Sequence, residues 1–301
     1  MDQIEEVLTK TDIVELIGEY VHLKRAGRNF KALCPFHSEK TPSFIVSPER
    51  QIFKCFGCGM GGNAIKFLME YEKMEFGEAL RFLAQRAGVT LRSYRPGPDE
   101  AKKRRLYQIN HLANELFHFL LVEHQTGKKA LEYLFNRGIQ KKTIEEFKIG
   151  YAPDKRNFLE QFIVQKKGFL KEELEASGLV FKTETNQLID RFRDRVVFPL
   201  LDHRGNIVGF SGRLLHPRKD VGKYINTPET LIYHKSQLLF GLVQAKEAIR
   251  QSKRAIVVEG EFDMISSYQA GIKNVVAIKG SALTEEQIKL LHRFAGEILL
   301  A

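Results

Sequence analysis

The three cysteines of the chain are spaced as metal ligands. Cys34 and His37 are separated by two residues, Cys55 and Cys58 likewise, and seventeen residues lie between the two pairs. Two such pairs can direct four ligand atoms at one ion in the tetrahedron that structural Zn²⁺ prefers, and thiolates with an imidazole favour zinc over magnesium or calcium. Because a closed set of four ligands leaves no position for a substrate, we expect one structural zinc ion per chain. An odd number of cysteines cannot all pair in disulfides, which favours a reducing, cytoplasmic setting.

A pair of carboxylates follows an apolar run near the end of the sequence. The run at residues 255–258 ends at Glu259, and Asp263 lies four residues further on. A helix that begins in between would carry Asp263 back beside Glu259, and the carboxyl ends of parallel strands form the ligand-binding edge of an open α/β sheet. Grouped carboxylates suit Mg²⁺, which proteins share with substrate phosphates. The pattern predicts a divalent metal site, with solvated acids at a helix N-terminus as the plainer alternative.

The length and net charge of the chain limit the classes of protein to which it can belong. With 301 residues, of which 43% are hydrophobic and 28% charged, the chain is expected to fold as two or three domains. Its formal net charge of +10 favours polyanionic partners. No apolar run approaches the roughly 20 residues of a membrane helix, and the N-terminus has no apolar signal core, so we expect neither membrane association nor secretion.

The hydrophobic pattern around the cysteines predicts a small zinc ribbon. The expected elements are, in chain order, two short amphipathic helices within residues 1–22 (the second capped by Thr11), strands at 44–46 and 52–55, and helices at 64–71 and 76–87. Basic residues beside aromatic ones suit single-stranded nucleic acid, in which bases stack and phosphates pair with cations. They are Lys24, Arg25, Arg28 and Lys31 beside Phe30, and Lys54 beside Phe53 and Phe56, with Phe53 itself expected in the core.

Beyond the ribbon, a segment rich in Pro, Gly and charge at residues 93–105 predicts a linker and a domain boundary. Strands and helices alternate after residue 239, which predicts a parallel sheet with right-handed crossovers. The expected elements are helices at 106–123, 129–136 and 141–147, strands at 195–201 and 206–212, and then a helix to 251, strand 255–258, helix 262–270, strand 275–278, helix 284–294 and strand 297–300.

Taken together, these motifs resemble bacterial DNA primases along essentially the whole chain. The cysteine–histidine set, followed by GMGG at 59–62, resembles the zinc-binding domain of that family. The segment VVEGEFD at 257–263 resembles the first acidic motif of the Toprim fold, which primases share with topoisomerases and some nucleases. Further segments resemble the basic subdomain of the RNA polymerase core, namely FRDRVVFPL at 192–200, GFSGR at 209–213, KYIN at 223–226 with Pro228 and Glu229, and His234 with Lys235.

The resemblance implies a multidomain α+β fold. An N-terminal zinc ribbon at residues 1–98 would precede a mixed α+β basic subdomain at 99–238, and a truncated α/β Toprim domain with a parallel sheet would follow at 239–301. The implied activity is DNA-templated synthesis of short RNA primers on single-stranded DNA from ribonucleoside triphosphates. The implied protein is a monomer, and its replicative helicase partner would bind through a C-terminal domain that is absent here.

The resemblance also implies roles for individual residues. Glu259 would be the catalytic acid, and Asp263 would join it in binding catalytic Mg²⁺ or Mn²⁺. Basic side chains would hold template phosphates or the incoming nucleotide, and Tyr224 and Asn226 would line the same groove. The basic residues are Arg193, Arg195, Arg213, Lys223 and Lys235.

Two departures from the family pattern affect these expectations. The family usually has an aromatic residue where Glu261 stands, so this extra acid either alters the metal site or is simply solvated. The second acidic motif, Asp-x-Asp, would follow the strand at 297–300, where the sequence ends, so we expect an N-terminal fragment that is inactive by itself. The alternatives are a Toprim nuclease or topoisomerase-like enzyme, and a zinc-ribbon nucleic-acid binder without catalytic activity.

Overall fold

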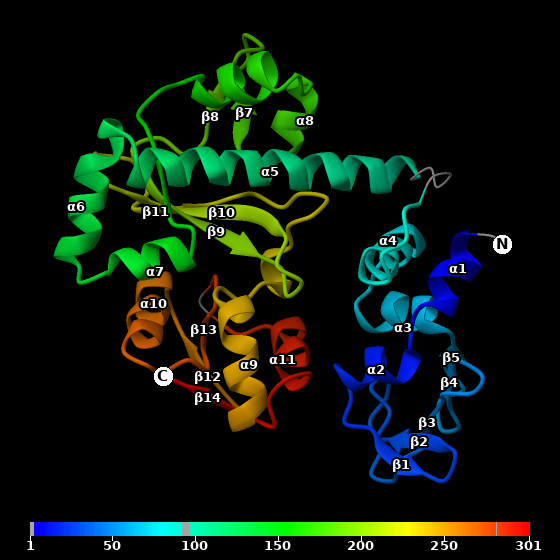
Figure 1. Ribbon diagram of the computed structural model, residues 1–301. Helices are drawn as coiled ribbons and strands as arrows, with labels where there is room; N and C mark the ends of the chain where they lie inside the picture. Colours follow the sequence, from blue (N-terminus) through cyan, green and yellow to red (C-terminus); the bar gives the residue numbers. More distant parts are fainter. Residues whose placement is uncertain (1–2, 92–96, 281) are drawn as a thin grey trace. The chain divides into compact units, whose positions relative to one another are not determined.

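The computed structural model describes residues 3–91, 97–280 and 282–301. The chain forms two compact units, Met1–Ala101 and Lys102–Ala301, called here the N-terminal and C-terminal units. Figure 1 shows the elements of both.

The N-terminal unit is built on an antiparallel sheet of five strands that are neighbours in chain order. Side chains alternate between a buried and an exposed face along β3 and β4, as expected for a sheet covered on one side. The strands are β1 Lys24–Ala26, β2 Asn29–Ala32, β3 Phe44–Ser47, β4 Ile52–Cys55 and β5 Gly61–Gly62, and the helices are α1 Gln3–Thr9, α2 Ile13–Gly18, α3 Ala64–Tyr71 and α4 Phe76–Arg86.

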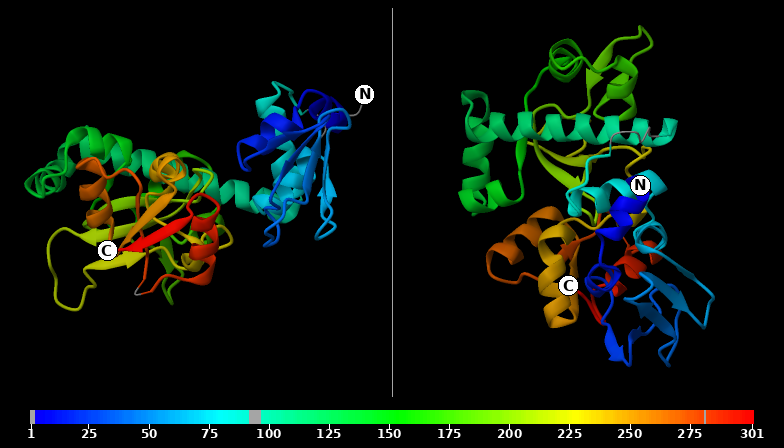
Figure 2. Two further views of the ribbon diagram at one scale, coloured as in Figure 1. Left: turned by 90° about the horizontal axis from the view of Figure 1, so that it is seen from below. Right: turned by 45° about the vertical axis from the view of Figure 1, so that its right-hand side comes forward.

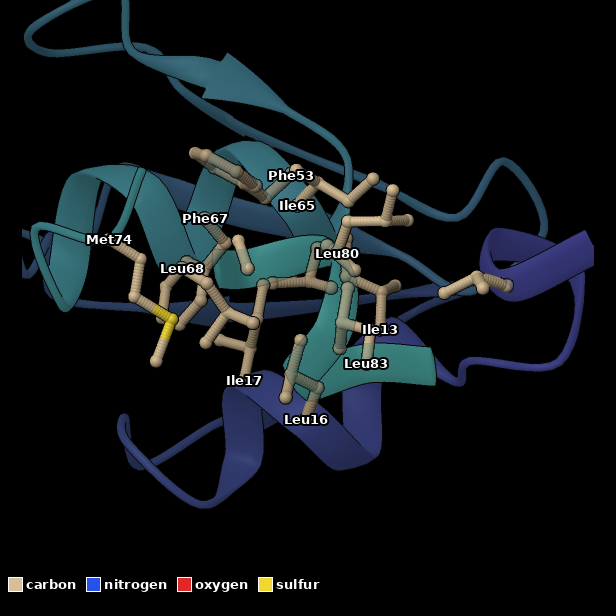
Figure 3. Packing of buried hydrophobic residues seen from close by; sticks show 14 of the residues in the cluster. Ile13, Leu16, Ile17, Phe53, Ile65, Phe67, Leu68, Met74, Leu80 and Leu83 are labelled. Atoms are coloured by element: carbon tan, nitrogen blue, oxygen red, sulfur yellow. The ribbon is translucent and has the colours of Figure 1, made fainter. Parts of the chain in front are cut away.

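Helices α2, α3 and α4 supply the core of this unit. Leu16 of α2, Phe67 of α3 and Leu83 of α4 are fully buried in one hydrophobic cluster, and Figure 3 shows these helices bringing their apolar side chains together. Phe53 of β4 is 1% exposed and stacks on Phe44 of β3 with ring centres 5.3 Å apart. The expectation that Phe53 belongs to the core is therefore confirmed.

The N-cap of α2 lies one residue after the expected one. Its N-cap is Asp12, whose side chain accepts hydrogen bonds from the N–H groups of Val14 and Glu15. The Thr11 hydroxyl donates instead to the carbonyl of Val7 at 2.7 Å. Because a carboxylate also interacts favourably with the positive end of the helix dipole, Asp12 is the stronger cap, and the prediction of Thr11 was wrong.

The expected linker at residues 93–105 is helical over much of its length. Residues 93–96 lie outside the described residues, but a helix, α5, already begins at Pro98. Proline suits the first turn of a helix, where its missing N–H costs no hydrogen bond, and Asp99 and Glu100 favour the same end. Residues 102–105 are therefore part of a helix surface and not of an irregular linker.

The C-terminal unit contains a four-stranded antiparallel sheet with the strand order β11-β10-β9-β6. Helix α5 lies across one face of this sheet (Figures 1 and 2), and its Phe117 meets Phe210 of β10 edge to face, with ring centres 5.8 Å apart. The elements are α5 Pro98–Val122, η1 Gln125–Gly127, α6 Lys128–Asn136, α7 Lys141–Glu146, β6 Gly150–Ala152, η2 Glu160–Lys166, α8 Lys171–Ala176, β7 Val180–Lys182, β8 Leu188–Asp190, β9 Arg195–Leu201, β10 Ile207–Leu214, β11 Tyr224–Asn226 and η3 Lys235–Gln237.

A parallel sheet with the strand order β13-β12-β14 follows in the same unit, as the alternating pattern predicted. One face of the sheet packs on α9 and α11, through residues such as Val257 and Leu291. The other face shares a core with the antiparallel sheet, where Phe198 and Met264 lie in one cluster. The elements are α9 Leu242–Ser252, β12 Arg254–Val258, α10 Glu261–Gln269, β13 Val275–Ala277, α11 Glu285–His292 and β14 Glu297–Leu300.

The fold class expected from the sequence is thus confirmed, with a small antiparallel sheet around the cysteines, a mixed α+β region and a parallel α/β region. Over the three ranges given above, no helix combines the length and the apolar content needed to cross a bilayer.

Candidate metal centres and nucleic-acid surface

The four side chains expected to bind zinc meet in the N-terminal unit. Cys34 and His37 lie between β2 and β3, Cys55 ends β4, and Cys58 lies in the following turn. One ligand atom from each residue is within 4.8 Å of the other three. Cys34 Sγ is 3.9 Å from Cys58 Sγ, and Cys55 Sγ is 3.8 Å from His37 Nδ1. Ligand atoms about 2.3 Å from a common tetrahedral centre have such separations, so the set fits a zinc ion.

Backbone groups around the sulfurs favour thiolates. The N–H groups of Phe36 and Cys58 donate to the sulfurs of Cys34 and Cys55, each at 3.4 Å. Burial opposes ionisation of Cys55, but the Cys58 N–H and the Ser43 hydroxyl outweigh it and lower the pKa of that thiol to about 6. Burial raises the pKa of Cys34 to about 12. Zinc binding would require this thiol to lose its proton, so metal binding should release protons.

Glu39, which the sequence analysis did not single out, connects the two ligand-bearing turns. Its Oε1 accepts hydrogen bonds from the N–H groups of Cys34 at 2.8 Å and Ser43 at 3.0 Å. Its Oε2 accepts the Ser43 hydroxyl at 2.5 Å and lies 3.3 Å from His37 Nε2. The same hydroxyl is 3.2 Å from Cys55 Sγ. Groups that hold metal ligands in this way fix their orientation, and the position of Glu39 two residues after His37 could have indicated the role.

The sheet face opposite the helices carries a row of basic side chains. Lys24 pairs with Lys31, Lys31 with Ile45, and Ile45 with Lys54 across four successive strands. Directly opposed residues of antiparallel strands project from the same face, so the three lysines flank one isoleucine in a line. Phe56, between the ligands in sequence, is 75% exposed. Phe30, which was expected beside the basic residues on the surface, packs instead against the core of the unit, because it shares a strand face with the buried Val46.

Glu259 and Asp263 lie at the carboxyl end of the parallel strand β12, and both are exposed. Gly260 between them is the N-cap of α10. Asp263 turns back over this glycine, because a Cβ added at Gly260 would lie 3.0 Å from Asp263 Oδ2. The two carboxylates therefore occupy the sheet edge at which open α/β sheets bind ligands, and they present oxygen ligands suited to a divalent cation.

Glu261 is not solvated, although it lies between these two acids. It is 5% exposed, and its carboxylate contacts the ammonium group of Lys279, which is 8% exposed. Lys279 follows β13, and the pairing of β12 with β13 continues up to it through the Ile278 N–H and the Val258 carbonyl, 3.1 Å apart. Burial and the charge of Lys235 lower the pKa of Lys279, to about 7. The Glu261 carboxylate is therefore the group that favours a proton on this amine.

Arg213 lies among aromatic rings next to the acidic turn. Its guanidinium is 5.2 Å from the ring centre of Tyr224 and 5.4 Å from that of Phe262, and it donates to the Tyr224 hydroxyl at 2.5 Å. Arg137, the C-cap of α6, lies 4.5 Å from the same Phe262 ring. Both guanidinium groups therefore pack on Phe262, the residue that precedes Asp263 in α10. Arg137 was not predicted as a site residue, since nothing in the sequence around it distinguishes it.

The other residues expected to line the groove lie at β11, in η3 and before β9. Lys223 is exposed beside Tyr224, and Asn226 on the same strand pairs with Ser211 of β10. Lys235 of η3 reaches the loop after β13, where its Nζ would lie 3.8 Å from a Cβ at Gly280. Arg193 is half-buried before β9, and its charge helps to lower the pKa of Asp154, after the Arg218 hydrogen bond and charge.

Arg195 differs from the role expected of it. It is 3% exposed, and its guanidinium donates to the carbonyls of Gly212, Gly222 and Lys223 at 2.9–3.2 Å. The side chain belongs to a strand whose residues are buried on both faces, so it has no access to a template phosphate. In this structure Arg195 stabilises the connection between β10 and β11 instead.

Comparison with known families divides the chain into three parts. Residues 1–97 match the CHC2 zinc finger, residues 117–246 the N-terminal domain of the DNA primase catalytic core, and residues 253–301 the Toprim domain. These matches define a zinc-binding chain with part of a Toprim-type nucleic-acid enzyme.

Matches to individual proteins identify the family more narrowly than the three domain matches do. The DNA primase of Geobacillus stearothermophilus is 46% identical over 97% of this chain. A crystal structure of the zinc-binding and RNA polymerase domains of Aquifex aeolicus primase is 37% identical, with a TM-score of 0.62, and this chain covers 72% of it. A primase catalytic domain solved with bound single-stranded DNA is 32% identical over 66% of this chain, with a TM-score of 0.60 and 63% of that chain covered.

The chain therefore belongs to the bacterial DNA primase family. It spans about half the length of the curated relatives that it matches, 49% for Geobacillus stearothermophilus and for Enterococcus faecalis.

Proposed function

We propose that this chain supplies template-binding and metal-binding parts of a DNA primase, which makes short RNA primers on single-stranded DNA by metal-dependent nucleotidyl transfer. The observation that carries the proposal is the position of two exposed carboxylates, Glu259 and Asp263, at a parallel-sheet edge, with Arg213 and Arg137 packed on the intervening Phe262. Phosphoryl transfer depends mainly on positioning the reactants and on stabilising negative charge. Metal ions and guanidinium groups both stabilise such charge.

Glu259 and Asp263 are the proposed ligands of Mg²⁺ or Mn²⁺, with Glu259 as the catalytic acid. When bound, the ion would stabilise the charge that develops on the transferred phosphoryl group. The side chains themselves need little rearrangement, because Gly260 allows Asp263 to turn back toward the strand end.

The groove beside these acids is the proposed binding site for the template and the incoming ribonucleoside triphosphate. Arg213, Lys223, Lys235 and Arg193 would contact phosphates, and Tyr224 and Asn226 would line the groove. Supporting this proposal, a relative with 32% identity was solved with bound single-stranded DNA. A role for a replicative helicase as a further partner rests on the family resemblance alone.

The N-terminal unit is proposed to hold one structural zinc ion through Cys34, His37, Cys55 and Cys58. Its basic sheet face and the exposed Phe56 would offer stacking and phosphate contacts to unpaired template bases. We propose the division into residues 1–98, 99–238 and 239–301 as the functional one, which limited proteolysis at the two junctions would test.

Primer synthesis is tested with this chain and with a chimera in which the remaining part of the Geobacillus stearothermophilus relative follows Ala301. We expect the chimera to incorporate labelled ribonucleotides on single-stranded DNA only when Mg²⁺ or Mn²⁺ is present. Glu259→Gln should reduce this synthesis at least 100-fold, since a metal ligand is lost. The matched control is Glu285→Gln, which removes an exposed acid of α11. Equal activity of the two variants would refute the assignment of Glu259.

A further inference from the structure

We infer that Lys279 is a positioning residue that holds the Glu261 carboxylate out of the divalent metal site and thereby sets the charge of that site. This inference rests on the proposed metal site at Glu259 and Asp263. It concerns a pair of residues to which the proposed activity assigns no role, since neither Glu261 nor Lys279 is exposed to substrate.

The turn between β12 and α10 carries three carboxylates within five residues, Glu259, Glu261 and Asp263. The first and third are exposed, whereas Glu261 is the first residue of α10 and is buried. Contact with Lys279 is what distinguishes Glu261 from its two neighbours. Without that partner, a buried carboxylate would be very unfavourable, and a site with three adjacent carboxylates would bind cations more strongly.

Lys279 is well placed to act on the turn because its backbone is fixed independently. The N–H of the preceding Ile278 donates to the carbonyl of Val258, the last residue of β12, at 3.1 Å. After Lys279, the loop leads to Thr284, whose hydroxyl donates to the Ser236 carbonyl of η3 at 2.5 Å. The backbone at Lys279 is thus tied to the sheet edge, and its ammonium group contacts the Glu261 carboxylate there.

The electrostatic consequence is a site with two effective negative charges. The Glu261–Lys279 pair is neutral as a whole, so only Glu259 and Asp263 contribute net charge to the exposed edge. Without Lys279, the Glu261 carboxylate would lose the partner that keeps it buried and would turn to the exposed edge, where it adds one negative charge. Without Glu261, Lys279 would keep only part of its positive charge, because burial lowers its pKa to about 7. Where water surrounds the exposed edge, each unit of charge roughly 6 Å from a divalent ion changes its affinity by about tenfold, and a drier edge would make the change larger.

The experiment measures Mn²⁺ binding to the full chain by electron paramagnetic resonance. We expect Lys279→Met to raise the Mn²⁺ affinity about tenfold and Glu261→Met to lower it by a smaller factor, because the remaining Lys279 is only partly charged. The double variant Glu261→Met with Lys279→Met should bind Mn²⁺ as the unmodified chain does, and it should fold well, because a buried ion pair can be replaced by apolar side chains of similar volume. Lys289→Met, which breaks a surface ion pair on α11, is the matched control and should change nothing.

Shifts of opposite sign in the two single variants identify charge as the cause, because structural damage would weaken binding in both. Loss of affinity in both, or unchanged affinity in both, would overturn the inference. If Lys279→Met fails to fold, the double variant decides the question. An Mn²⁺ affinity of the double variant that differs from that of the unmodified chain would then overturn the inference. The proposed metal site is tested separately by Glu259→Gln: if this variant binds Mn²⁺ as tightly as the unmodified chain, the site itself is misplaced.

Discussion

The carboxylate Oε2 of Glu39 lies 3.3 Å from Nε2 of His37, on the side of the ring opposite the nitrogen that faces the cysteine sulfurs. This contact fixes the imidazole so that Nδ1 points at the ligand set. Burial raises the pKa of Glu39, but the Ser43 hydroxyl and other donors outweigh it and lower that pKa, so the side chain is a carboxylate at neutral pH. Such groups behind a ligand contribute to metal affinity without touching the metal.

We therefore expect Glu39→Gln to weaken zinc binding by about 10- to 100-fold. The measurement is competition against a chromophoric chelator under reducing conditions. Glu49→Gln, at an exposed position in the same unit, is the control and should leave the affinity unchanged. If the two variants retain the same zinc affinity, Glu39 has only a structural role in the loop.

Replacing a ligand should have a larger effect. Purified protein should contain about one zinc per chain, and Cys55→Ser should release it, because three ligands do not close a structural tetrahedron. Hydrogen exchange should then rise across residues 30–60 and stay unchanged in the C-terminal unit, since the two units are separately compact. A Cys34–Cys58 disulfide without metal after reducing purification in the presence of zinc would contradict the site.

The zinc site could be predicted from sequence because its geometry depends on short spacing along the chain. Two residues between ligands fix a turn, and only the meeting of two turns had to be assumed. The same applies to the acidic turn, where Glu259 and Asp263 flank a glycine at a strand end. Local patterns also predicted the parallel sheet, because alternation of strands and helices constrains connectivity strongly.

Other features depend on which strand face a side chain occupies, and these could not be predicted. Arg195 belongs to a segment that contains both basic and apolar residues, so the sequence does not show whether its side chain faces solvent or the core. Only the packing of β9 shows that it faces inward. Glu261 was expected either at the metal site or in solvent, because its partner Lys279 lies eighteen residues away across a strand pairing. Such long-range pairs leave no periodic signal in the sequence.

Asp190 should make stability depend on pH. Burial raises its pKa to about 7, although its carboxylate accepts the Leu159 N–H at 3.0 Å. Its pKa in the unfolded chain is about 3.9. A carboxyl whose pKa is raised by folding contributes stability below the unfolded value, and that contribution is lost as the pH rises toward 7.

Asp190→Asn should remove this dependence. The free energy of unfolding of the variant, relative to the unmodified chain, should rise between pH 4 and pH 7 by up to about 4 kcal/mol. Urea unfolding of both proteins at several pH values measures it, and effects of pH on other groups cancel in the difference. A difference that is constant with pH would mean that the carboxyl titrates near its usual value.

The final prediction concerns single-stranded DNA. Residues 1–98 carry 14 basic and 12 acidic residues, so +8 of the net charge of +10 belongs to the rest of the chain. Binding should therefore depend mainly on the C-terminal unit and weaken as salt rises, because counterions are released from the phosphates. Fluorescence anisotropy of a labelled oligonucleotide at several NaCl concentrations gives the slope of log affinity against log salt.

Arg213→Gln and Lys223→Gln should each reduce that slope by about one phosphate contact, because each removes a cation from the proposed groove. Lys182→Met is the control, since this exposed lysine lies on β7, beyond α5 from the parallel sheet (Figure 1), and it should leave the slope unchanged.

Arg195→Gln provides a second contrast. It should lower the free energy of unfolding by about 2–4 kcal/mol, because buried carbonyls of Gly212 and its neighbours lose their donor, and leave the salt slope of the folded protein unchanged. If Arg195→Gln reduced the slope while Arg213→Gln and Lys223→Gln did not, the template would follow a different path from the proposed groove.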